Sequence, residues 1–419
     1  MIAFFDKYTE NAGKLQETMR CMGEDAKIAV LSGEGFLPSG ILSPYDFFSY
    51  GSRQEGFAEK DLFYNFIPLP EFWEVRLTGG TGGIFDMGCE KAKIYFREPA
   101  EKRNVQRVEW HMEDGWVYKI DYYNKYALKY ASEFLDTERN VESRVYYSEK
   151  NQEMVVEQPV NHMISLLDRG MVRELFDSRA EFIAGYLEEA GLGEEECVLF
   201  VQEEKTFEDL SLTSEAGKMW TKVLFSDPGL LNQYVGMGGT NGFRFYEIPE
   251  QYRENHGRGE AMILTASDRV EQIEYLISVL PEMRFHIAAH TQVSDKLRKL
   301  EESGNVRVYP QISRQDLDML WDTCDFYLDI NHYYEIYDAV NAAHTRNQII
   351  LGFDNTVHHR ELLADEGIFA EAEQEKMALT IRELMANPAR VQELLGAQQK
   401  KKREIWQDLW MRRENGHGI

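Results

Sequence analysis

The chain has 419 residues, of which 43% are hydrophobic and 28% are charged, a composition typical of a globular protein with two or three domains. The formal net charge of −26 argues against a nucleic-acid partner, because a strongly acidic protein repels a phosphate backbone. The four cysteines (Cys21, Cys89, Cys197 and Cys324) are widely separated, which argues against a disulfide framework or a zinc site and favours a reducing compartment.

The first fifty residues have the pattern of an α/β unit. Apolar runs at residues 2–6 and 26–32 predict two strands, and the helical spacing of residues 11–23 predicts a helix between them. A glycine-containing loop follows the second strand. We predict that residues 1–48 and 165–243 together form a first doubly wound, Rossmann-like lobe.

Residues 49–164 have a different pattern, which predicts an inserted antiparallel β-meander. Short runs rich in β-branched and aromatic residues alternate with turn signals such as Asp114-Gly115 and Lys150-Asn151. The glycine pairs of residues 77–83 are not followed by a helical pattern, so we interpret them as a hairpin loop rather than a nucleotide-binding loop. The expected strands are residues 91–98, 105–110, 116–124, 143–149 and 153–158, with residues 162–168 as the last strand of the meander or the first after it.

The α/β pattern then resumes. Ser178 and Glu181 form a capping-box signature at the start of an amphipathic helix over residues 178–192. The continuous apolar run at residues 196–204 is typical of a buried parallel strand. Residues 226–242 carry many glycines, which indicates a hinge or crossover between lobes.

Residues 244–400 alternate strictly between strand and helix, which predicts a second doubly wound lobe. We expect residues 358–367 and 372–406 to be helical, and residues 401–419 to form a C-terminal helix. The fold class is therefore α/β, with two Rossmann-like lobes and an inserted meander. Expected strands of the second lobe are residues 260–267, 283–290, 305–312, 325–331 and 348–354.

Glu335 is the leading candidate for a functional side chain, because it follows a strand and a short loop where a carboxylate accepts hydrogen bonds from sugar hydroxyls. The sequence contains no GxSxG, HExxH or P-loop motif. Basic side chains near other strand ends are suited to a diphosphate, although solvated surface charge is the more ordinary explanation for each. The predicted cleft residues are Arg269, His290, Lys296, Asn331 and Glu335.

The order of elements over about residues 260–400 resembles the nucleotide-binding lobe of retaining glycosyltransferases with the GT-B architecture. In that family a second Glu follows the first after seven residues. This chain has Ala343 at the corresponding position, or Ala342 if the register shifts by one. Neither side chain can bind a ribose hydroxyl through a carboxylate.

The whole chain resembles the accessory-Sec glycosylation chaperones, which are non-catalytic partners of the O-GlcNAc transferase that modifies serine-rich repeat adhesins of Gram-positive bacteria. Where members of that family often have Gly-Asn before the Glu, this chain has Tyr333 and Tyr334. The stretches that carry the resemblance are residues 35–48, 67–75, 91–110, 121–127, 305–313 and 327–336.

The resemblance implies a cytoplasmic subunit that is not an enzyme and has no cofactor. It implies a hetero-oligomer in which this subunit docks to a catalytic O-GlcNAc transferase subunit, partly through the meander, and helps to hold the adhesin polypeptide during its glycosylation before export. Aromatic and arginine side chains suit such an interface, although some of them must fill the core of the meander. The predicted partner-binding residues are Arg97, Arg103, Arg107, Trp110, Tyr123 and Asn124.

Two other functions stay open from the sequence. One is an active retaining transferase that uses UDP-GlcNAc with Glu335 alone, and the other is a stand-alone protein-binding scaffold. The basic and aromatic residues 399–413 permit a peripheral contact with the inner face of the cell membrane, and a C-terminal helix that packs back on the first lobe is the more ordinary interpretation.

Overall fold

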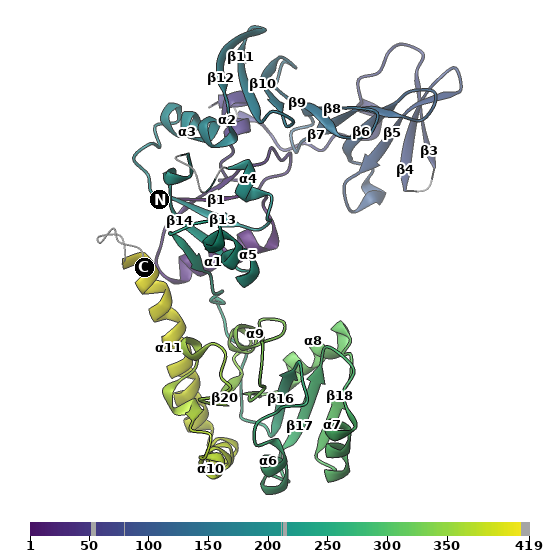
Figure 1. Cartoon of the computed structure of the whole chain (residues 1–419). Helices are drawn as coiled ribbons and strands as arrows, with labels where there is room; N and C mark the ends of the chain where they lie inside the picture. Colours follow the sequence, from purple (N-terminus) through teal and green to yellow (C-terminus); the bar gives the residue numbers. More distant parts are fainter. Residues whose placement is uncertain (52–55, 79, 211, 213–215, 412–419) are drawn as a thin grey trace. The chain divides into compact units, whose positions relative to one another are not determined.

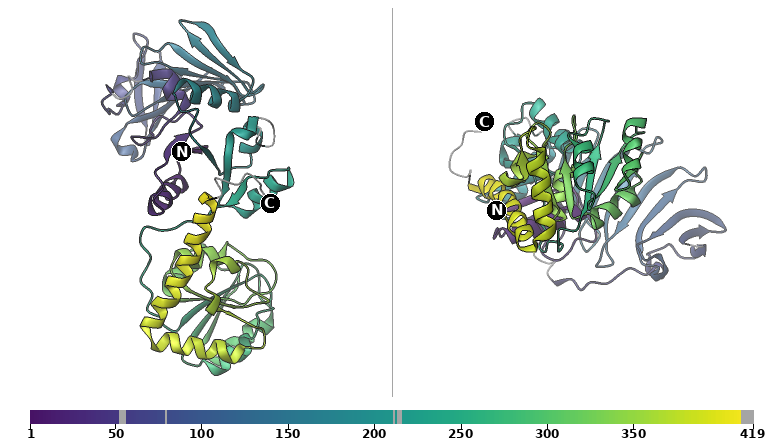
Figure 2. Two further views of the ribbon diagram at one scale, coloured as in Figure 1. Left: turned by 90° about the vertical axis from the view of Figure 1, so that its left-hand side faces the viewer. Right: turned by 90° about the horizontal axis from the view of Figure 1, so that it is seen from below.

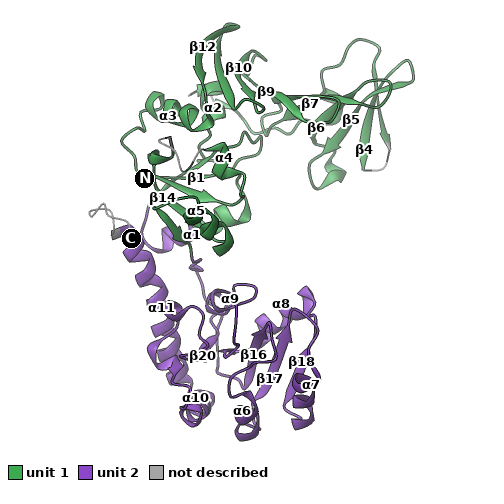
Figure 3. Cartoon of the chain, viewed as in Figure 1, with its two compact units in different colours: residues 1–16, 25–245, 418–419 green, residues 17–24, 246–417 purple. Residues whose placement is uncertain are grey.

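The structure (Figure 1) is a computed structural model that describes residues 1–51, 56–78, 80–210, 212 and 216–411. The chain divides into two units (Figure 3). Of the described residues, the first contains 1–16 and those from 25 to 245, and the second contains 17–24 and 246–411. Helix α1 (Glu10–Cys21) begins in the first unit and ends in the second.

The first unit contains a parallel sheet of five strands in the order β15-β14-β13-β1-β2. The residues of β1 and β13 are all buried, as expected for strands that are covered on both faces. The strands are β1 (Ile2–Phe5), β2 (Lys27–Val30), β13 (Cys197–Val201), β14 (Trp220–Phe225) and β15 (Gly242–Arg244). Its other helices are α2 (Pro44–Tyr50), α3 (Arg179–Glu189), α4 (Thr206–Asp209) and α5 (Pro228–Gly236), with 3₁₀ turns η2 (Tyr64–Phe66), η3 (Ala100–Lys102) and η4 (Ala216–Met219).

A ten-stranded antiparallel sheet fills the rest of the first unit, and its strands follow one another in sequence order from β3 to β12. Most of the strand pairings contain a register shift, and such bulges bend and twist a sheet. The strands are β3 (Glu74–Thr78), β4 (Thr81–Asp86), β5 (Cys89–Phe96), β6 (Val105–His111), β7 (Val117–Tyr123), β8 (Lys129–Leu135), β9 (Val141–Tyr147), β10 (Glu153–Gln158), β11 (Met163–Asp168) and β12 (Met171–Phe176).

Two hydrophobic clusters cover different ends of this sheet. In the first cluster, residues 62–73 pack against β3–β7. In the second cluster, α2 and α3 pack against β8–β12. Tyr45 of α2 and Phe182 of α3 lie in the second cluster, where the Tyr45 ring stacks on Tyr146 at 4.2 Å. Helix α3 begins at the predicted residue, because the Ser178 hydroxyl accepts a hydrogen bond from the Glu181 N–H at 3.2 Å.

A buried charge network joins the antiparallel sheet to helix α3. Glu157 of β10 accepts hydrogen bonds from Arg144 Nη1 at 3.1 Å and from Arg179 Nη2 at 2.6 Å. Burial alone would raise the pKa of Glu157, but the charges of Arg179 and Arg144 outweigh it and lower that pKa. The carboxylate therefore stays ionised inside the protein. It holds helix α3, which packs against the parallel sheet, to strand β10 of the antiparallel sheet.

The second unit contains a parallel sheet of six strands in the order β18-β17-β16-β19-β20-β21, the doubly wound order of a Rossmann fold. Figure 2 shows the sheet with its helices from two further sides. Its strands are β16 (Glu260–Thr265), β17 (Arg284–Ala289), β18 (Val306–Tyr309), β19 (Phe326–Asp329), β20 (Ile349–Phe353) and β21 (Ile368–Phe369). Its helices are α6 (Ile273–Val279), α7 (Asp295–Lys299), α8 (Arg314–Thr323), α9 (Ala339–Thr345), α10 (Gln374–Ala386) and α11 (Pro388–Met411), with 3₁₀ turns η5 (Leu300–Ser303), η6 (Arg360–Leu362) and η7 (Asp365–Gly367).

Helices cover both faces of this sheet. Residues of α6, α7, α10 and the start of α11 pack in one hydrophobic cluster, and residues of α8 and α9 pack in another. The predicted pair of Rossmann-like lobes with an inserted antiparallel meander is thereby confirmed.

Several predicted boundaries differ from the observed ones. The antiparallel sheet continues past residue 164 to Phe176, because β11 and β12 pair within it. Residues 358–367 form two short 3₁₀ turns, η6 and η7, and not the expected helix. The expected helix over residues 372–406 is divided at Pro388, which occupies the first position of α11 because proline cannot donate a helical N–H.

Two further regions differ from the sequence interpretation. The glycine-rich residues 226–242 contain α5 and lead into β15, which pairs with β14, so that they belong to the first unit. The 77–83 region forms the expected hairpin of β3 and β4, with residue 79 outside the described residues.

All four cysteines are free thiols. None of the described helices combines the length and the apolar character that crossing a membrane requires.

The strand at one end of the antiparallel sheet is uncovered. Among the described strands, β12 pairs with β11 alone, and its residues from Met171 to Leu175 are exposed. Met171, Val172 and Leu175 are therefore apolar side chains in solvent on a strand with free backbone groups. Arg173 on the same strand forms an ion pair with Glu189 of α3 at 2.6 Å.

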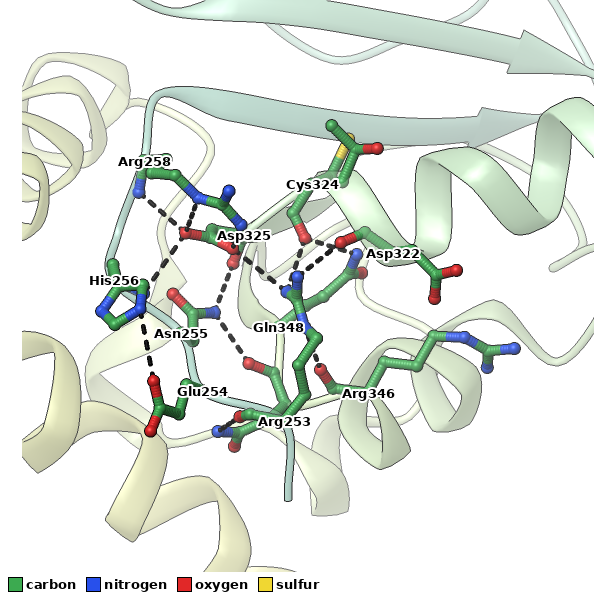
Figure 4. A network of polar contacts seen from close by, with 12 residues as sticks. Arg253, Glu254, Asn255, His256, Arg258, Asp322, Cys324, Asp325, Arg346 and Gln348 are labelled. Carbon is green, nitrogen blue, oxygen red and sulfur yellow. Dashed lines mark hydrogen bonds and ion pairs between the residues drawn. The ribbon is translucent and has the colours of Figure 1, made fainter. Parts of the chain in front are cut away.

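Residues 253–258, which precede β16 in the second unit, are bound to the amino end of β19 (Figure 4). Asp325 is fully buried and accepts hydrogen bonds from Arg253 Nη2 at 3.1 Å and from Arg258 N at 2.9 Å and Nε at 3.1 Å. Asn255 donates to the carbonyls of Asp325 and Asn347. Although burial alone would raise the pKa of Asp325, the bonds and charge of Arg258 together with the charge of Arg253 lower it.

Replacing Asp325 by alanine removes the acceptor of this network. N–H donors of Arg253 and Arg258 then lose their hydrogen-bond partner. We expect Asp325→Ala to lower the free energy of unfolding by about 3 kcal/mol, at the lower end for a broken buried ion pair because both arginines are partly exposed. Urea denaturation measures this. The matched control is Glu254→Ala, since Glu254 is exposed and its ion pair with His256 lies at the surface. Equal losses in both variants would contradict a special role for the buried carboxylate.

Candidate functional site

The predicted cleft lies at the topological switch point of the six-stranded sheet. The strand order reverses between β16 and β19, and ligands of doubly wound folds bind outside the carboxyl ends of such strands. The loop after β16 carries Arg269, and the loop after β19 carries Asn331 and Glu335. Asn331 is buried, and its side-chain oxygen bonds the Thr265 hydroxyl at 2.6 Å. These contacts hold the two loops together.

Both carboxylate oxygens of Glu335 are bonded within the protein. Oε1 accepts a hydrogen bond from the Val340 N–H at 2.7 Å, and Oε2 lies 3.1 Å from His359 Nε2. Val340 is in the first turn of α9, where unpaired N–H groups and the helix dipole favour a carboxylate. Glu335 therefore caps a helix and pairs with a histidine in the observed arrangement.

A chain of polar contacts continues from Glu335 to Tyr246. His359 Nδ1 lies 3.1 Å from Glu361 Oε1, which accepts a hydrogen bond from the Tyr246 hydroxyl at 3.0 Å. Hydrogen bonds to Glu335 and Glu361 raise the pKa of His359 to about 10. Burial alone would raise the pKa of Glu335, but its hydrogen bonds with His359 and with the Val340 N–H lower that pKa. The charged imidazolium of His359 is therefore held between the carboxylates of Glu335 and Glu361.

A second histidine fixes the loop that precedes Glu335. His358 Nδ1 lies 2.8 Å from Asp329 Oδ1 at the end of β19, and its Nε2 lies 2.8 Å from the Tyr333 carbonyl oxygen. Tyr333 has a φ of +75°, a conformation that glycine adopts readily and that costs a tyrosine about 1 kcal/mol or more. The backbone at this position therefore has a conformation that suits glycine better than tyrosine. These histidine contacts also explain why residues 358–367 do not form the expected helix.

The position expected for a second carboxylate lies inside the protein. Ala343 is fully buried in the hydrophobic cluster between α8 and α9. Beside it, Asn341 Oδ1 accepts a hydrogen bond from Lys402 Nζ of α11 at 3.0 Å. Lys402 is buried, and desolvation lowers its pKa to about 7. No described side chain thus supplies a second acid at this place on α9.

The other predicted cleft residues have mixed environments. The guanidinium of Arg269 lies over the Tyr333 ring at 5.7 Å, and His290 bonds the Tyr337 hydroxyl. Lys296 forms an ion pair with Glu274 of α6 at 3.8 Å, and both side chains are largely exposed. Its place in the candidate site stays a prediction.

Glu335, Asp338 and His359 each offer one ligand atom within 4.8 Å of the others, which is close enough for a divalent cation. Glu335 and His359 already bond one another, so that the contacts among them explain the cluster without a metal ion.

The predicted docking surface lies on the antiparallel sheet. Trp110, half-buried, lines a cavity of about 380 Å³ and donates from Nε1 to Asp121 at 2.7 Å. Phe66 lines the same cavity and is 72% exposed. Most of the exposed large apolar side chains of the described residues lie on this sheet or beside it: Phe63, Phe66, Phe72, Leu77, Met87, Met112, Val160, Met171, Val172 and Leu175.

Not all of the predicted docking residues reach the surface. Tyr123 and Asn124 are buried, and Asn124 accepts hydrogen bonds from the N–H groups of Tyr126 and Leu128 while it donates to the Tyr50 hydroxyl. We assign these two residues to the internal packing of the first unit.

The three arginines of the predicted surface have partners but stay partly accessible. Arg97 pairs with Asp61 at 3.3 Å, Arg107 with Glu109 at 2.9 Å, and the guanidinium of Arg103 lies over the Phe96 ring at 5.4 Å.

Comparison with known proteins shows relatives along nearly the whole chain. Models of the GtfB N-terminal domain, the GtfB middle domain and the GftB/GlyA-F C-terminal domain match residues 2–48, 73–177 and 261–398. The UDP-N-acetylglucosamine–peptide N-acetylglucosaminyltransferase stabilizing protein GtfB of Streptococcus agalactiae is 31% identical, over 92% of each chain. The protein of the same name from Streptococcus gordonii is 30% identical, over 95% of this chain and 94% of its own. This chain belongs to the GtfB family.

A solved structure agrees with this assignment. A chain in the crystal structure of the GtfA/B complex bound to UDP and GlcNAc is 26% identical and has a TM-score of 0.51, over 99% of this chain and all of that one. The GT-B-like fold and the chaperone-type family predicted from the sequence are confirmed. GtfB relatives are named as stabilizing proteins of a transferase, and the predicted supporting role agrees with that name.

The sequence located Glu335 but missed the residues that engage it. His359, Glu361 and Tyr246 are distant from Glu335 in sequence and meet it only through the fold. The available signal was the pair His358 and His359, which follows the predicted strand at residues 348–354.

The charged state of His359 predicts a pH dependence of stability. The folded pKa of about 10 exceeds the ordinary value of 6.5, so the stabilisation is complete below about pH 6.5 and is lost as the pH rises through about 10. Because the pKa values of Glu335 and Glu361 are lowered, acidification below about pH 4.5 removes it as well. We expect His359→Gln to reduce the free energy of unfolding by about 1–2 kcal/mol near pH 7 and by much less above about pH 10.

Urea denaturation of both proteins across this pH range measures the difference. His256→Gln is the matched control, because His256 is exposed and its ion pair is with an exposed acid. A constant difference between the wild type and His359→Gln at all pH values would contradict the ion-pair explanation.

Proposed function

We propose that this GtfB-family chain is the non-catalytic stabilising subunit of a peptide N-acetylglucosaminyltransferase and acts in the cytoplasm. The observation that carries the proposal is its relation, over more than nine-tenths of both chains, to proteins named as stabilizing that enzyme. The site in the second unit supports it, because both oxygens of Glu335 are bonded internally and the position expected for the second acid is the buried Ala343. We further propose that the chain holds a Ser/Thr-rich adhesin polypeptide while the catalytic subunit transfers GlcNAc to that polypeptide.

We propose the antiparallel sheet as the docking surface for the catalytic subunit. It carries most of the exposed apolar side chains described in the chain, and aromatic and arginine residues dominate the energetics of protein interfaces. Trp110 and Phe66 line a cavity there, Arg107 lies on β6 of the same sheet, and Arg97 and Arg103 lie in the connection between β5 and β6. A peripheral membrane contact through residues 399–413 stays a prediction, and the burial of Trp406 and Trp410 in that stretch offers it no support.

The docking surface predicts a charge substitution that weakens assembly. We expect Phe66→Asp to weaken binding to the catalytic subunit about tenfold or more, because an exposed aromatic contact is replaced by a hydrated charge. Co-purification and isothermal titration with the catalytic subunit measure this. The matched control is Leu379→Asp, an apolar residue on α10 of the second unit that is 64% exposed. Weaker binding for the control alone would move the docking surface to the second unit.

The internally bonded Glu335 predicts that this site does not process the sugar nucleotide. In the assembled pair we expect Glu335→Gln to leave UDP-GlcNAc hydrolysis by the catalytic subunit within about twofold, a free-energy change below about 0.5 kcal/mol. Hydrolysis assays on the purified pair measure this. Loss of hydrolysis with assembly intact would contradict the proposal.

The alternative of an active transferase has its own test. Isothermal titration of the isolated chain with UDP-GlcNAc, followed by a transfer assay on a Ser/Thr peptide, is expected to show neither binding nor product. Micromolar binding with transfer by the isolated chain would establish the alternative.

A further inference from the structure

A buried lysine in the second unit joins two helices away from solvent. Lys402 of α11 has no exposed surface, whereas the side chain of Lys400, two residues before it, is 76% exposed. Lys402 Nζ donates hydrogen bonds to Asn341 Oδ1 at 3.0 Å and to Thr345 Oγ1 at 3.2 Å, and both acceptors lie on α9. The amino group therefore holds the C-terminal half of α11 to α9 inside the protein.

Both hydrogen-bond acceptors of Lys402 are neutral, although a buried ammonium is stable only when its charge is compensated. Among the described residues, the carboxylates of Glu247 and Asp338 favour the charged form through their charge alone, without a hydrogen bond. Burial outweighs that attraction and lowers the pKa of Lys402 to about 7. The partly buried Arg144 and Arg179 of the first unit, in contrast, each pair directly with a carboxylate.

The other titratable groups around this part of α11 supply no compensating charge. His344 of α9 is buried, its Nε2 lies 3.0 Å from the Gln398 carbonyl oxygen, and burial lowers its pKa to about 3. Burial raises the pKa of Tyr252 to about 12, so both rings are neutral near pH 7. Glu361 of η6, which packs on α11, is already bonded within the network around Glu335. The remaining charges nearby reach solvent: Arg360, Asp365, Lys401 and Arg403.

A second contact, one turn further along α11, joins the helix to the network around Glu335. Trp406 Nε1 donates a hydrogen bond to the Tyr246 carbonyl oxygen at 3.0 Å. The contacts that begin at the Tyr246 hydroxyl lead to Glu335, which caps α9. Lys402 and Trp406 are four residues apart and lie on one face of α11. Helix α11, helix α9 and the Glu335 network thus form a closed loop of contacts, in which Lys402 supplies a direct bond between the two helices.

We propose that Lys402 is a pH-sensitive latch that holds the C-terminal half of α11 against α9. The neutral amine fits the buried position and its two neutral acceptors. The protonated form favours an open state, in which this half of α11 separates from α9 and water reaches the ammonium group. The inference concerns the second unit alone and does not rest on the proposed function.

The sign of the pH dependence follows from proton binding. In the open state Lys402 has its ordinary pKa of 10.5, so that opening takes up a proton between about pH 7 and about pH 10.5. The closed state therefore becomes less stable as the pH falls through this range, and below about pH 7 the penalty stays constant. The raised pKa of His359 gives the opposite dependence up to about pH 10, so that global unfolding conceals the latch. A local measurement is needed.

Amide hydrogen exchange of the full chain, followed by mass spectrometry, measures the opening of α11 as protection factors. The decisive variant is Lys402→Met, which keeps an unbranched side chain and removes the charge. For amides in the C-terminal half of α11, we expect the ratio of the Lys402→Met protection factor to that of the wild type to rise about tenfold or more between pH 9 and pH 7. One titrating group changes the opening equilibrium by up to about tenfold for each pH unit in this range.

Lys400→Met is the matched control, because it removes an exposed lysine whose ion pair with Glu404 lies at the surface. Its ratio to the wild type is expected to stay within about twofold at both pH values. Lys402→Arg keeps a charge at every pH and is expected to lower protection at pH 9 as well as at pH 7. The thermal unfolding midpoint verifies that each variant is folded.

Three results would overturn the inference. The first is a Lys402→Met ratio that is the same at pH 7 and pH 9. The second is an equal pH dependence for Lys400→Met, which would show that the effect does not come from the buried position. The third is protection at the wild-type level in Lys402→Arg at pH 9, because the closed state would then accept a permanent charge.

Discussion

The first unit depends on one buried carboxylate. Glu157 lies on the antiparallel sheet, and it pairs with Arg144 of the same sheet and with Arg179 of α3, which packs beside the parallel sheet. Removing either arginine would leave a charge uncompensated away from water, so that the two sheets are held in one relative position. A polar cavity of about 480 Å³ between the two sheets exists because this position is fixed, and both arginines line it.

The two parallel sheets each provide a switch point, and the carboxylates there have different contacts. In the second unit, Glu335, His359, Glu361 and Tyr246 bond one another at the carboxyl edge, which leaves that carboxylate no free oxygen among the described contacts. In the first unit, Asp6 and Glu34 each bond through one oxygen, and among the described contacts the other oxygen is free.

The sequence predicted the elements whose signals are local. Ser178 and Glu181 correctly placed the start of α3, and alternating strand and helix patterns gave the doubly wound second unit. The sequence missed the continuation of the antiparallel sheet into β12, because exposed residues there do not alternate in burial. It also missed the first-unit cavity, because the lining comes from segments that are far apart in the chain. Glu335 was found by its place after a strand, but its partners are set by tertiary contacts.

The exposed outer edge of β12 has a consequence for cells that make this subunit. A strand with free backbone groups and apolar side chains is a template for pairing with another strand, including the same strand of a second copy. Arg173 and Glu174 interrupt the apolar surface of β12. When the β12 edges of two copies meet, repulsion between their like charges opposes the pairing only in part. Protein synthesised in excess of whatever normally covers this edge is therefore prone to aggregate, so balanced synthesis of the subunits favours its solubility.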